Sequence, residues 1–149
     1  MSDFIDVFIH ASKSVRAVMD ARLRRHGLHL GQNLVLAALW EKDGQTPGAI
    51  ASAVNVTTPT IVKMANRMTA AGLLARRRDE RDSRLVRLHL TDAGRALREP
   101  VEHELAELEK HLTAGLDEGE IRVLMDSLAR VAAGAQALMD GPAGEDPGC

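Results

Sequence analysis

The sequence predicts a mainly α-helical protein that contains a winged helix-turn-helix, with N- and C-terminal helices for dimerisation. Apolar residues recur at helical spacing over most of the 149 residues. Two Thr-Pro helix starts lie close together near the middle of the chain. One pair of short alternating segments follows them, joined by a charged hairpin. Helix, tight turn, helix and ribbon, in this order, define the expected fold.

The first helix is expected from Asp3 to about Arg25, ending at Gly27. Its apolar side chains recur at intervals of four and seven residues: Phe4, Phe8, Val15, Met19 and Leu23. The second helix, expected at Gln32–Lys42, is apolar around most of its circumference, which favours a central, buried position.

Two short helices should come next. Thr46 before Pro47 is typical of a helix start, so we expect a helix at Pro47–Val54. Asn55 tolerates a positive φ and suits a tight turn. Thr57 and Thr58 before Pro59 repeat the start signal, and this helix should run to about Ala71 and end at Gly72. At 100° per residue, its core side should hold Ile61, Ala65, Met68 and Gly72, and its outward side Pro59, Val62, Lys63, Asn66 and Ala70.

Strands are predicted at Leu74–Arg78 and Leu85–Leu90, with the hairpin Asp79–Arg84 between them. One long helix should then begin after Thr91, and another after Asp117, where Glu120 completes a capping box. The stripes of these helices are Val101, Leu105, Leu108 and Leu112, and then Ile121, Leu124, Leu128, Val131, Ala135 and Leu138.

These elements predict three parts. Residues 1–27 and 95–140 form a helical dimerisation region, 28–94 the winged helix-turn-helix, and 141–149 (GPAGEDPGC) a disordered tail.

Charge is segregated along the chain, although the net charge is only −2. From Lys63 to Arg87 there are eight basic and three acidic residues. From Glu99 to Glu120 there are eight acidic residues, offset only by Lys110. A phosphate backbone would be attracted to the first segment and repelled by the second, so the sequence favours double-stranded DNA as a partner. We expect the acids of the hairpin, Asp79 and Asp82, to orient neighbouring arginines.

Other function classes fit less well. Aromatic residues make up only 2% of the chain. This argues against a single-strand nucleic-acid binder, because such proteins stack bases on aromatic side chains. There is no glycine-rich phosphate loop or nucleophile elbow, so we expect no enzyme activity, catalytic residue or cofactor. His103, Glu107 and His111 lie away from the apolar stripe, and we interpret them as a solvated face rather than a metal site. His26 and His29 should have a helix-terminus or loop role.

The location expected from the sequence is the cytoplasm. Cys149 is the only cysteine, which suits a reducing compartment, and no signal peptide is seen. The longest apolar run is seven residues, Leu34–Trp40, too short to span a membrane.

From Leu30 to Leu97 the sequence resembles the MarR family of bacterial regulators. The resemblance is carried by Val35-Leu36, Val56–Val62, Gly72-Leu73, Asp79–Arg84 and Leu88–Gly94. It implies a homodimer in which the first and last two helices interleave with those of the partner. The two reading helices would then enter successive major grooves about 34 Å apart on a pseudo-palindromic site.

The resemblance implies a sequence-specific double-stranded DNA-binding transcription regulator whose wing-tip Arg84 enters the minor groove. A repressor is expected, and an activator stays open as the alternative. The expected DNA contacts are Thr57, Thr58, Pro59, Thr60, Val62, Lys63, Asn66, Arg67, Arg76, Arg81 and Arg84. Two positions depart from the family pattern: Asn33, where an aromatic residue is common, and Val62, where Ser or Thr is common.

Two questions stay open at this point. A small-molecule effector is possible but has no identity, and Asn33 argues against the familiar aromatic-lined pocket for one. The alternative function is a winged-helix protein-interaction module that binds no DNA, and the steepness of duplex binding against salt distinguishes the two.

Overall fold

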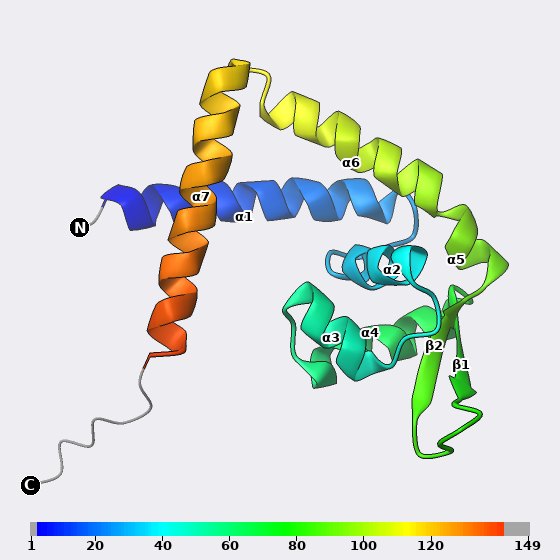
Figure 1. The fold of residues 1–149 in the computed structure, drawn as a ribbon. Coiled ribbons are helices and arrows are strands. Elements are labelled where there is room, and N and C mark those ends of the chain that lie inside the picture. The colour runs from blue at the N-terminus through cyan, green and yellow to red at the C-terminus, as the bar shows by residue number, and fades with distance from the viewer. Residues whose placement is uncertain (1–2, 142–149) are drawn as a thin grey trace, which may run out of the picture. The chain divides into compact units, whose positions relative to one another are not determined.

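The computed structural model describes residues 3–141, which fold into seven helices and one two-stranded sheet (Figure 1). In order they are α1 (Asp3–Arg24), α2 (Gln32–Glu41), α3 (Pro47–Val54), α4 (Thr58–Ala70), β1 (Leu74–Arg78), β2 (Val86–Leu90), α5 (Asp92–Ala96), α6 (Arg98–Leu112) and α7 (Glu118–Met139). The predicted fold class is confirmed. The predicted tail, apart from Gly141, lies outside the described residues.

The chain divides into two compact units between Leu108 and Glu109. The first unit contains α1 to α5, the sheet and most of α6. The second contains the end of α6 and all of α7. No helix of residues 3–141 combines the length and apolar character that a membrane span needs.

The helix boundaries around α3 and α4 follow the predicted start and turn signals. The Thr46 hydroxyl accepts a hydrogen bond from the Ala49 backbone amide at 3.2 Å and caps α3. Asn55 has the expected positive φ of 55°, and the chain turns there into α4. Gly72 follows the helix with φ 79° and is exposed, so it ends α4 and does not pack on the core side where the helical wheel placed it.

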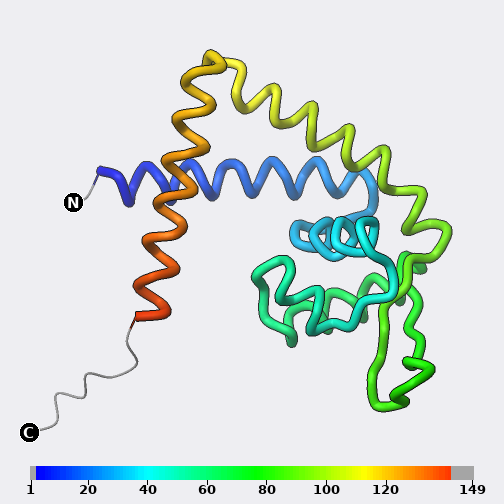
Figure 2. The backbone as a smooth tube through the Cα atoms, in the orientation of Figure 1, coloured from blue at the N-terminus to red at the C-terminus, as the bar shows by residue number. Residues whose placement is uncertain are grey.

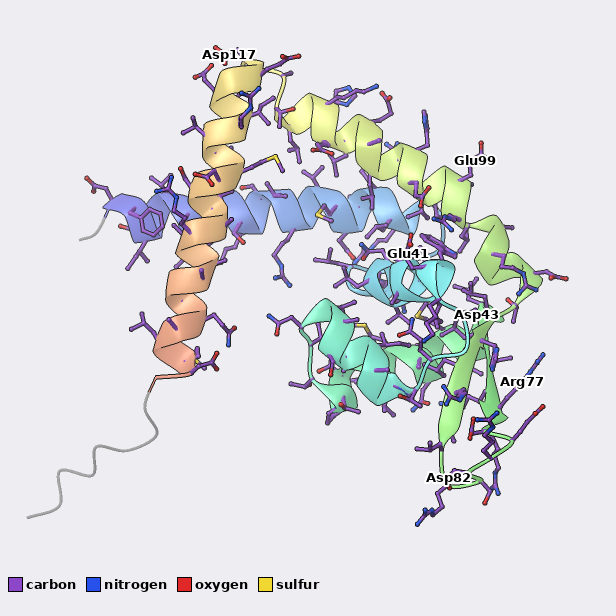
Figure 3. All side chains as sticks on the ribbon, in the orientation of Figure 1. Glu41, Asp43, Arg77, Asp82, Glu99 and Asp117 are labelled. Atoms are coloured by element: carbon purple, nitrogen blue, oxygen red, sulfur yellow. The ribbon has the colours of Figure 1, made fainter. Side chains whose placement is uncertain are left out.

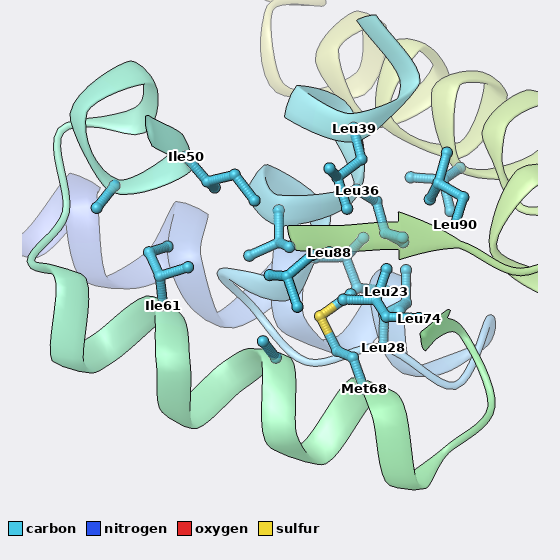
Figure 4. Close-up of a cluster of buried hydrophobic side chains, with 14 residues drawn as sticks. Leu23, Leu28, Leu36, Leu39, Ile50, Ile61, Met68, Leu74, Leu88 and Leu90 are labelled. Atoms are coloured by element: carbon cyan, nitrogen blue, oxygen red, sulfur yellow. The ribbon is translucent and has the colours of Figure 1, made fainter. Parts of the chain in front are cut away.

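The core of the first unit gathers around α2, as its all-round apolar sequence predicted. Val35, Leu36 and Leu39 of α2 are at most 1% exposed. They pack with apolar side chains from the neighbouring elements (Figure 4): Leu23, Leu28, Ile50, Ala51, Ile61, Ala65, Met68, Leu74, Leu88, Leu90 and Val101. The buried face of α4 therefore fixes the direction of its opposite face.

The two strands pair antiparallel, with Leu74 opposite Leu90 and Arg77 opposite Arg87. An isolated hairpin is marginally stable in water. Here Leu74, Leu88 and Leu90 anchor one end of it in the core, and the Leu88 amide donates to the Gln45 carbonyl at 2.8 Å. The other end extends away from the helices as a wing (Figure 2).

One predicted element is corrected. The single helix expected after Thr91 is two helices, α5 and α6, with a break at Leu97. Pro100 explains the break, because proline has no amide hydrogen to give to the carbonyl of Ala96 and its ring would collide there. Proline is tolerated in the first turn of a helix, where Pro100 lies in α6. The Thr91 cap itself is confirmed, with its hydroxyl accepting from the Gly94 amide at 3.2 Å.

The capping box at the start of α7 is confirmed. The Asp117 carboxylate accepts from the Glu120 amide at 2.8 Å, and the Glu120 carboxylate accepts from the Asp117 amide at 3.1 Å. None of the residues of α7 is buried. Among its apolar side chains, Val123 is 66% exposed, Leu124 43% and Leu128 40%.

Candidate DNA-binding surface

The first turn of α4 is an exposed group of small polar side chains. Thr57, Thr58, Pro59 and Thr60 are all exposed. Thr57 occupies the cap position, but its side chain caps no backbone amide. Its hydroxyl instead pairs with the Thr60 hydroxyl at 2.9 Å. Amides at a helix start are well placed to bind a phosphate oxygen, and small side chains allow a close approach.

The two faces of α4 divide as the helical wheel predicted. Ile61, Ala65 and Met68 are at most 2% exposed and hold the helix against the core. The outward face exposes four of the residues expected to contact DNA: Val62, Lys63, Asn66 and Arg67. The helix therefore presents an apolar contact, an amide and two cations on one accessible side, which is a suitable set for reading base edges and phosphates.

The wing turn is organised by the two aspartates, as expected. The Asp79 carboxylate accepts from the backbone amides of Arg81 at 3.2 Å and Asp82 at 2.9 Å. The Asp82 carboxylate accepts from Arg84 Nε at 3.1 Å, and the Arg84 side chain is 88% exposed. Figure 3 shows Asp82 at the far end of the hairpin. Asp82 thus orients the Arg84 side chain, which remains accessible at the wing tip.

Ion pairing within the wing also lowers the pKa of both aspartates. The hydrogen bond from the Arg87 side chain, followed by that from the Asp82 amide, holds the pKa of Asp79 below its usual range. The side-chain and backbone hydrogen bonds from Arg84 do the same for the pKa of Asp82. Both carboxylates are therefore ionised at neutral pH and keep their arginine partners.

The remaining wing arginines are accessible. Arg76 and Arg81, both expected to contact DNA, are exposed, as are Arg77 and Arg78. The register places Arg76 opposite Leu88 and Arg77 opposite Arg87, so successive arginines lie on opposite faces of the ribbon. The structure thus brings the predicted contacts together in two groups, the outward face of α4 and the wing.

Sequence reasoning missed an ion-pair cluster between α1 and α6. Glu104 accepts from Arg22 Nη1 at 3.2 Å and from His26 Nε2 at 3.1 Å, and Arg25 Nη1 lies 3.5 Å away. The hydrogen bond from His26, followed by that from Arg22, lowers the pKa of Glu104. Because these partners are separated by about eighty positions, no helical periodicity could have linked them.

A small recess lies beside α2. It has a volume of about 160 Å³ and is lined by Asn33, Ala37, Trp40, Glu41, Val101, Glu102 and Leu105. Asn33 is 8% exposed, and its side-chain oxygen accepts from the Gly31 amide at 3.0 Å. Ligand pockets usually measure about 300–1,000 Å³, so this recess is smaller than a usual effector site. The structure shows no group of three potential metal ligands within residues 3–141.

Comparison with known proteins gives the same fold. The structure of the S. aureus MepR–DNA complex superposes with a TM-score of 0.81 at 24% identity, covering 90% of this chain and 99% of that one. The regulator SlyA gives 0.78 at 22%, covering 90% and 94%. A Listeria monocytogenes MarR-family protein complexed with DNA gives 0.77 at 17%, covering 97% and 99%.

Sequence comparison identifies curated relatives. The transcriptional regulator TtmR of Methylorubrum extorquens is 34% identical over 110 residues, which are 72% of this chain and 54% of TtmR. The uncharacterized regulator YdgJ of Bacillus subtilis is 28% identical over 97 residues, 65% of this chain and 59% of YdgJ. The chain thus spans little more than half the length of the curated relatives that it matches.

The buried α2, the α3–α4 pair and the wing define a winged helix-turn-helix protein. The MarR family model matches residues 28–86, from just before α2 to the start of β2. Across its winged helix-turn-helix, the chain is similar to MarR-family regulators in both sequence and fold.

Proposed function

We propose that this protein is a sequence-specific double-stranded DNA-binding transcription regulator that acts as a repressor on a pseudo-palindromic operator. The observation that carries the proposal is the joint presentation of the outward face of α4 and the Arg84 wing tip on one basic segment. Lys63 and Arg67 are exposed on α4, and Arg76 and Arg81 are exposed on the wing. MarR-family proteins of the same fold have been crystallised with DNA, which supports this partner.

The two parts of the surface have different tasks in this proposal. The α4 face reads base edges in the major groove, where Lys63 and Asn66 can hydrogen-bond and Val62 can contact a thymine methyl group. Arg84 enters the adjacent minor groove and senses its width and potential. The amides of the first turn of α4 hold a phosphate and set the register.

The proposed regulator is a homodimer. Phe4 and Phe8 of α1 stack with ring centroids 5.9 Å apart yet remain 55% and 41% exposed. The stripe of α7 is exposed as well, with Leu124 at 43% and Leu128 at 40%. Soluble proteins rarely leave apolar faces of this extent uncovered, and a second copy of the chain covers them in a two-fold arrangement. Its place would be the cytoplasm, and its role regulatory rather than catalytic.

The test is selection of duplexes from a random-sequence pool by the full chain. The expected motif is a pseudo-palindrome whose half-sites are centred about 34 Å, one helical turn, apart. Affinity for the recovered duplex should fall steeply with rising salt. A protein that recovers no duplex at low ionic strength, or an asymmetric motif, would contradict the proposal.

Two substitutions test whether the α4 face and the wing tip contact DNA. Lys63→Ala should weaken binding and relax base preference at the position that Lys63 reads. Arg84→Ala should weaken binding most on duplexes with a narrow minor groove beneath the wing. Lys13→Ala is the matched control, because Lys13 is exposed on α1 outside the basic segment. Wild-type affinity in both surface variants would refute the assignment.

A further inference from the structure

Arg87 differs from the other arginines of the wing because its guanidinium is bonded to the chain outside the hairpin as well as within it. It lies on β2, opposite Arg77. Its Nε donates to Asp79 Oδ1 at 2.8 Å, and its Nη1 donates to the Gly44 carbonyl at 3.0 Å. One side chain thus joins the second strand, the first residue of the wing turn and the loop between α2 and α3.

The hydrogen bonding continues from Asp79 to the wing tip. The other oxygen of the Asp79 carboxylate accepts from the amides of Arg81 and Asp82, which lie within the turn. The Asp82 carboxylate in turn accepts from the amide and the guanidinium of Arg84. A continuous series of hydrogen bonds therefore runs from the loop at Gly44 through Arg87 and Asp79 to Arg84.

We propose that Arg87 is a positioning residue that sets the direction of the wing relative to the helix-turn-helix, and through it the place where Arg84 meets DNA. This inference rests on the proposed DNA-binding function. The hydrophobic anchors of the hairpin, Leu74, Leu88 and Leu90, are all near its base. Beyond these leucines the ribbon does not contact the core. The hydrogen bonds of Arg87, which link the wing turn to the α2–α3 loop, therefore limit the movement of the wing relative to the helices.

The geometry assigns Arg87 a role different from that of a phosphate ligand. Its side chain is 38% exposed, against 88% for Arg84, and two of its nitrogens already have acceptors. The planar fork of arginine suits this arrangement, because it donates in two fixed directions at once. A lysine carries the same charge but has a single ammonium on a flexible stem and cannot reproduce the fork.

The experiment compares Arg87→Lys with Arg77→Lys. Both variants keep the charge of the wing, and the two positions face each other in the register. Arg77 is exposed and makes no side-chain hydrogen bond or ion pair with residues 3–141, so it is the matched control. The probe is the duplex that the wild-type chain recovers from a random-sequence pool, and the melting temperature of each variant is measured alongside.

Arg87→Lys is expected to lower DNA affinity by about threefold to tenfold, and Arg77→Lys by less than about twofold. In Arg87→Lys, hydroxyl-radical protection in the minor groove beneath the wing should weaken, while major-groove protection by α4 remains. Arg84→Ala should cost less in the Arg87→Lys background than alone, because the two changes act on one contact. General destabilisation would instead weaken both protections together and leave the cost of Arg84→Ala unchanged.

A second measurement needs no DNA. Hydrogen exchange at the Arg81 and Asp82 amides should become faster in Arg87→Lys and stay unchanged in Arg77→Lys, because these amides donate to Asp79. Equal DNA affinity of the two variants, or unchanged exchange in Arg87→Lys, overturns the positioning role and leaves the proposed function standing. A wild-type chain that recovers no duplex overturns both.

Discussion

Replacing Leu124 and Leu128 of α7 together by alanine should weaken the homodimer by a measurable amount. The two side chains are 43% and 40% exposed within the single chain. Fully burying a leucine side chain contributes about 2 kcal/mol, so covering the exposed two-fifths contributes about 0.8 kcal/mol. A two-fold dimer contains two such leucines from each of two protomers, so the double variant reduces the association free energy by about 3 kcal/mol. The dimer dissociation constant should rise about 150-fold.

The assay is sedimentation equilibrium over a dilution series, with the melting temperature measured at each concentration. Alanine has a high helix propensity, so α7 should keep its helical circular dichroism. Leu85→Ala is the control, because Leu85 is 42% exposed on the wing, outside α1 and α7. If the double variant dissociates at the same concentration as Leu85→Ala, the α7 stripe does not form the interface and the dimer must be built differently.

Two further predictions concern the first unit. In Glu104→Gln, stability should be lower than in wild type at neutral pH, because Arg22 and Arg25 lose their charged partner and His26 loses its carboxylate acceptor. The pKa of Glu104 is lowered in the fold, so its contribution is complete above the usual value of 4.5 and disappears as pH falls through the folded pKa. The difference in melting temperature should therefore narrow in acid, and a difference independent of pH would contradict this. Leu88→Ala should reduce the free energy of unfolding by about 2–5 kcal/mol in denaturant titration, because Leu88 is 1% exposed; a reduction as small as that of the exposed Leu85→Ala would be inconsistent with its place in the core.

The parts of the fold that the sequence predicted well are those determined by neighbours in the chain. Thr46 and the Asp117–Glu120 capping box act over three residues, and Asn55 acts on its own backbone. The burial of α2 follows from its composition alone. Pro100 is a local signal of the same kind, and its position in the first turn of α6 could have predicted the break between α5 and α6.

The parts that the sequence could not predict depend on contacts between distant segments. Arg87 and Arg77 look alike in sequence, since each belongs to the same run of basic residues. Only the fold brings the Gly44 carbonyl, forty-three positions away in the chain, to the Arg87 guanidinium, so that Arg87 links the wing to the α2–α3 loop. The partners of Glu104 are similarly remote, 78 and 82 positions away. Charge patterning therefore located the basic segment but could not separate the arginines that bind inside the protein from those that are accessible.

That separation determines the electrostatics of the proposed DNA contact. The segment from Lys63 to Arg87 carries eight basic and three acidic residues, a net charge of +5, so the rest of the chain, with a total of −2, carries −7. Two of the three acids, Asp79 and Asp82, are bound to Arg87 and Arg84, and Arg84 stays 88% exposed. Each of these two carboxylates is neutralised by an arginine and stabilises the wing, so neither would face the DNA phosphates as an unpaired negative charge. A wing with fewer acidic residues would attract DNA more strongly, but it would lack the hydrogen bonds that orient the Arg84 side chain. The acidic residues of the wing therefore favour precise positioning of Arg84 at the cost of some electrostatic attraction to DNA.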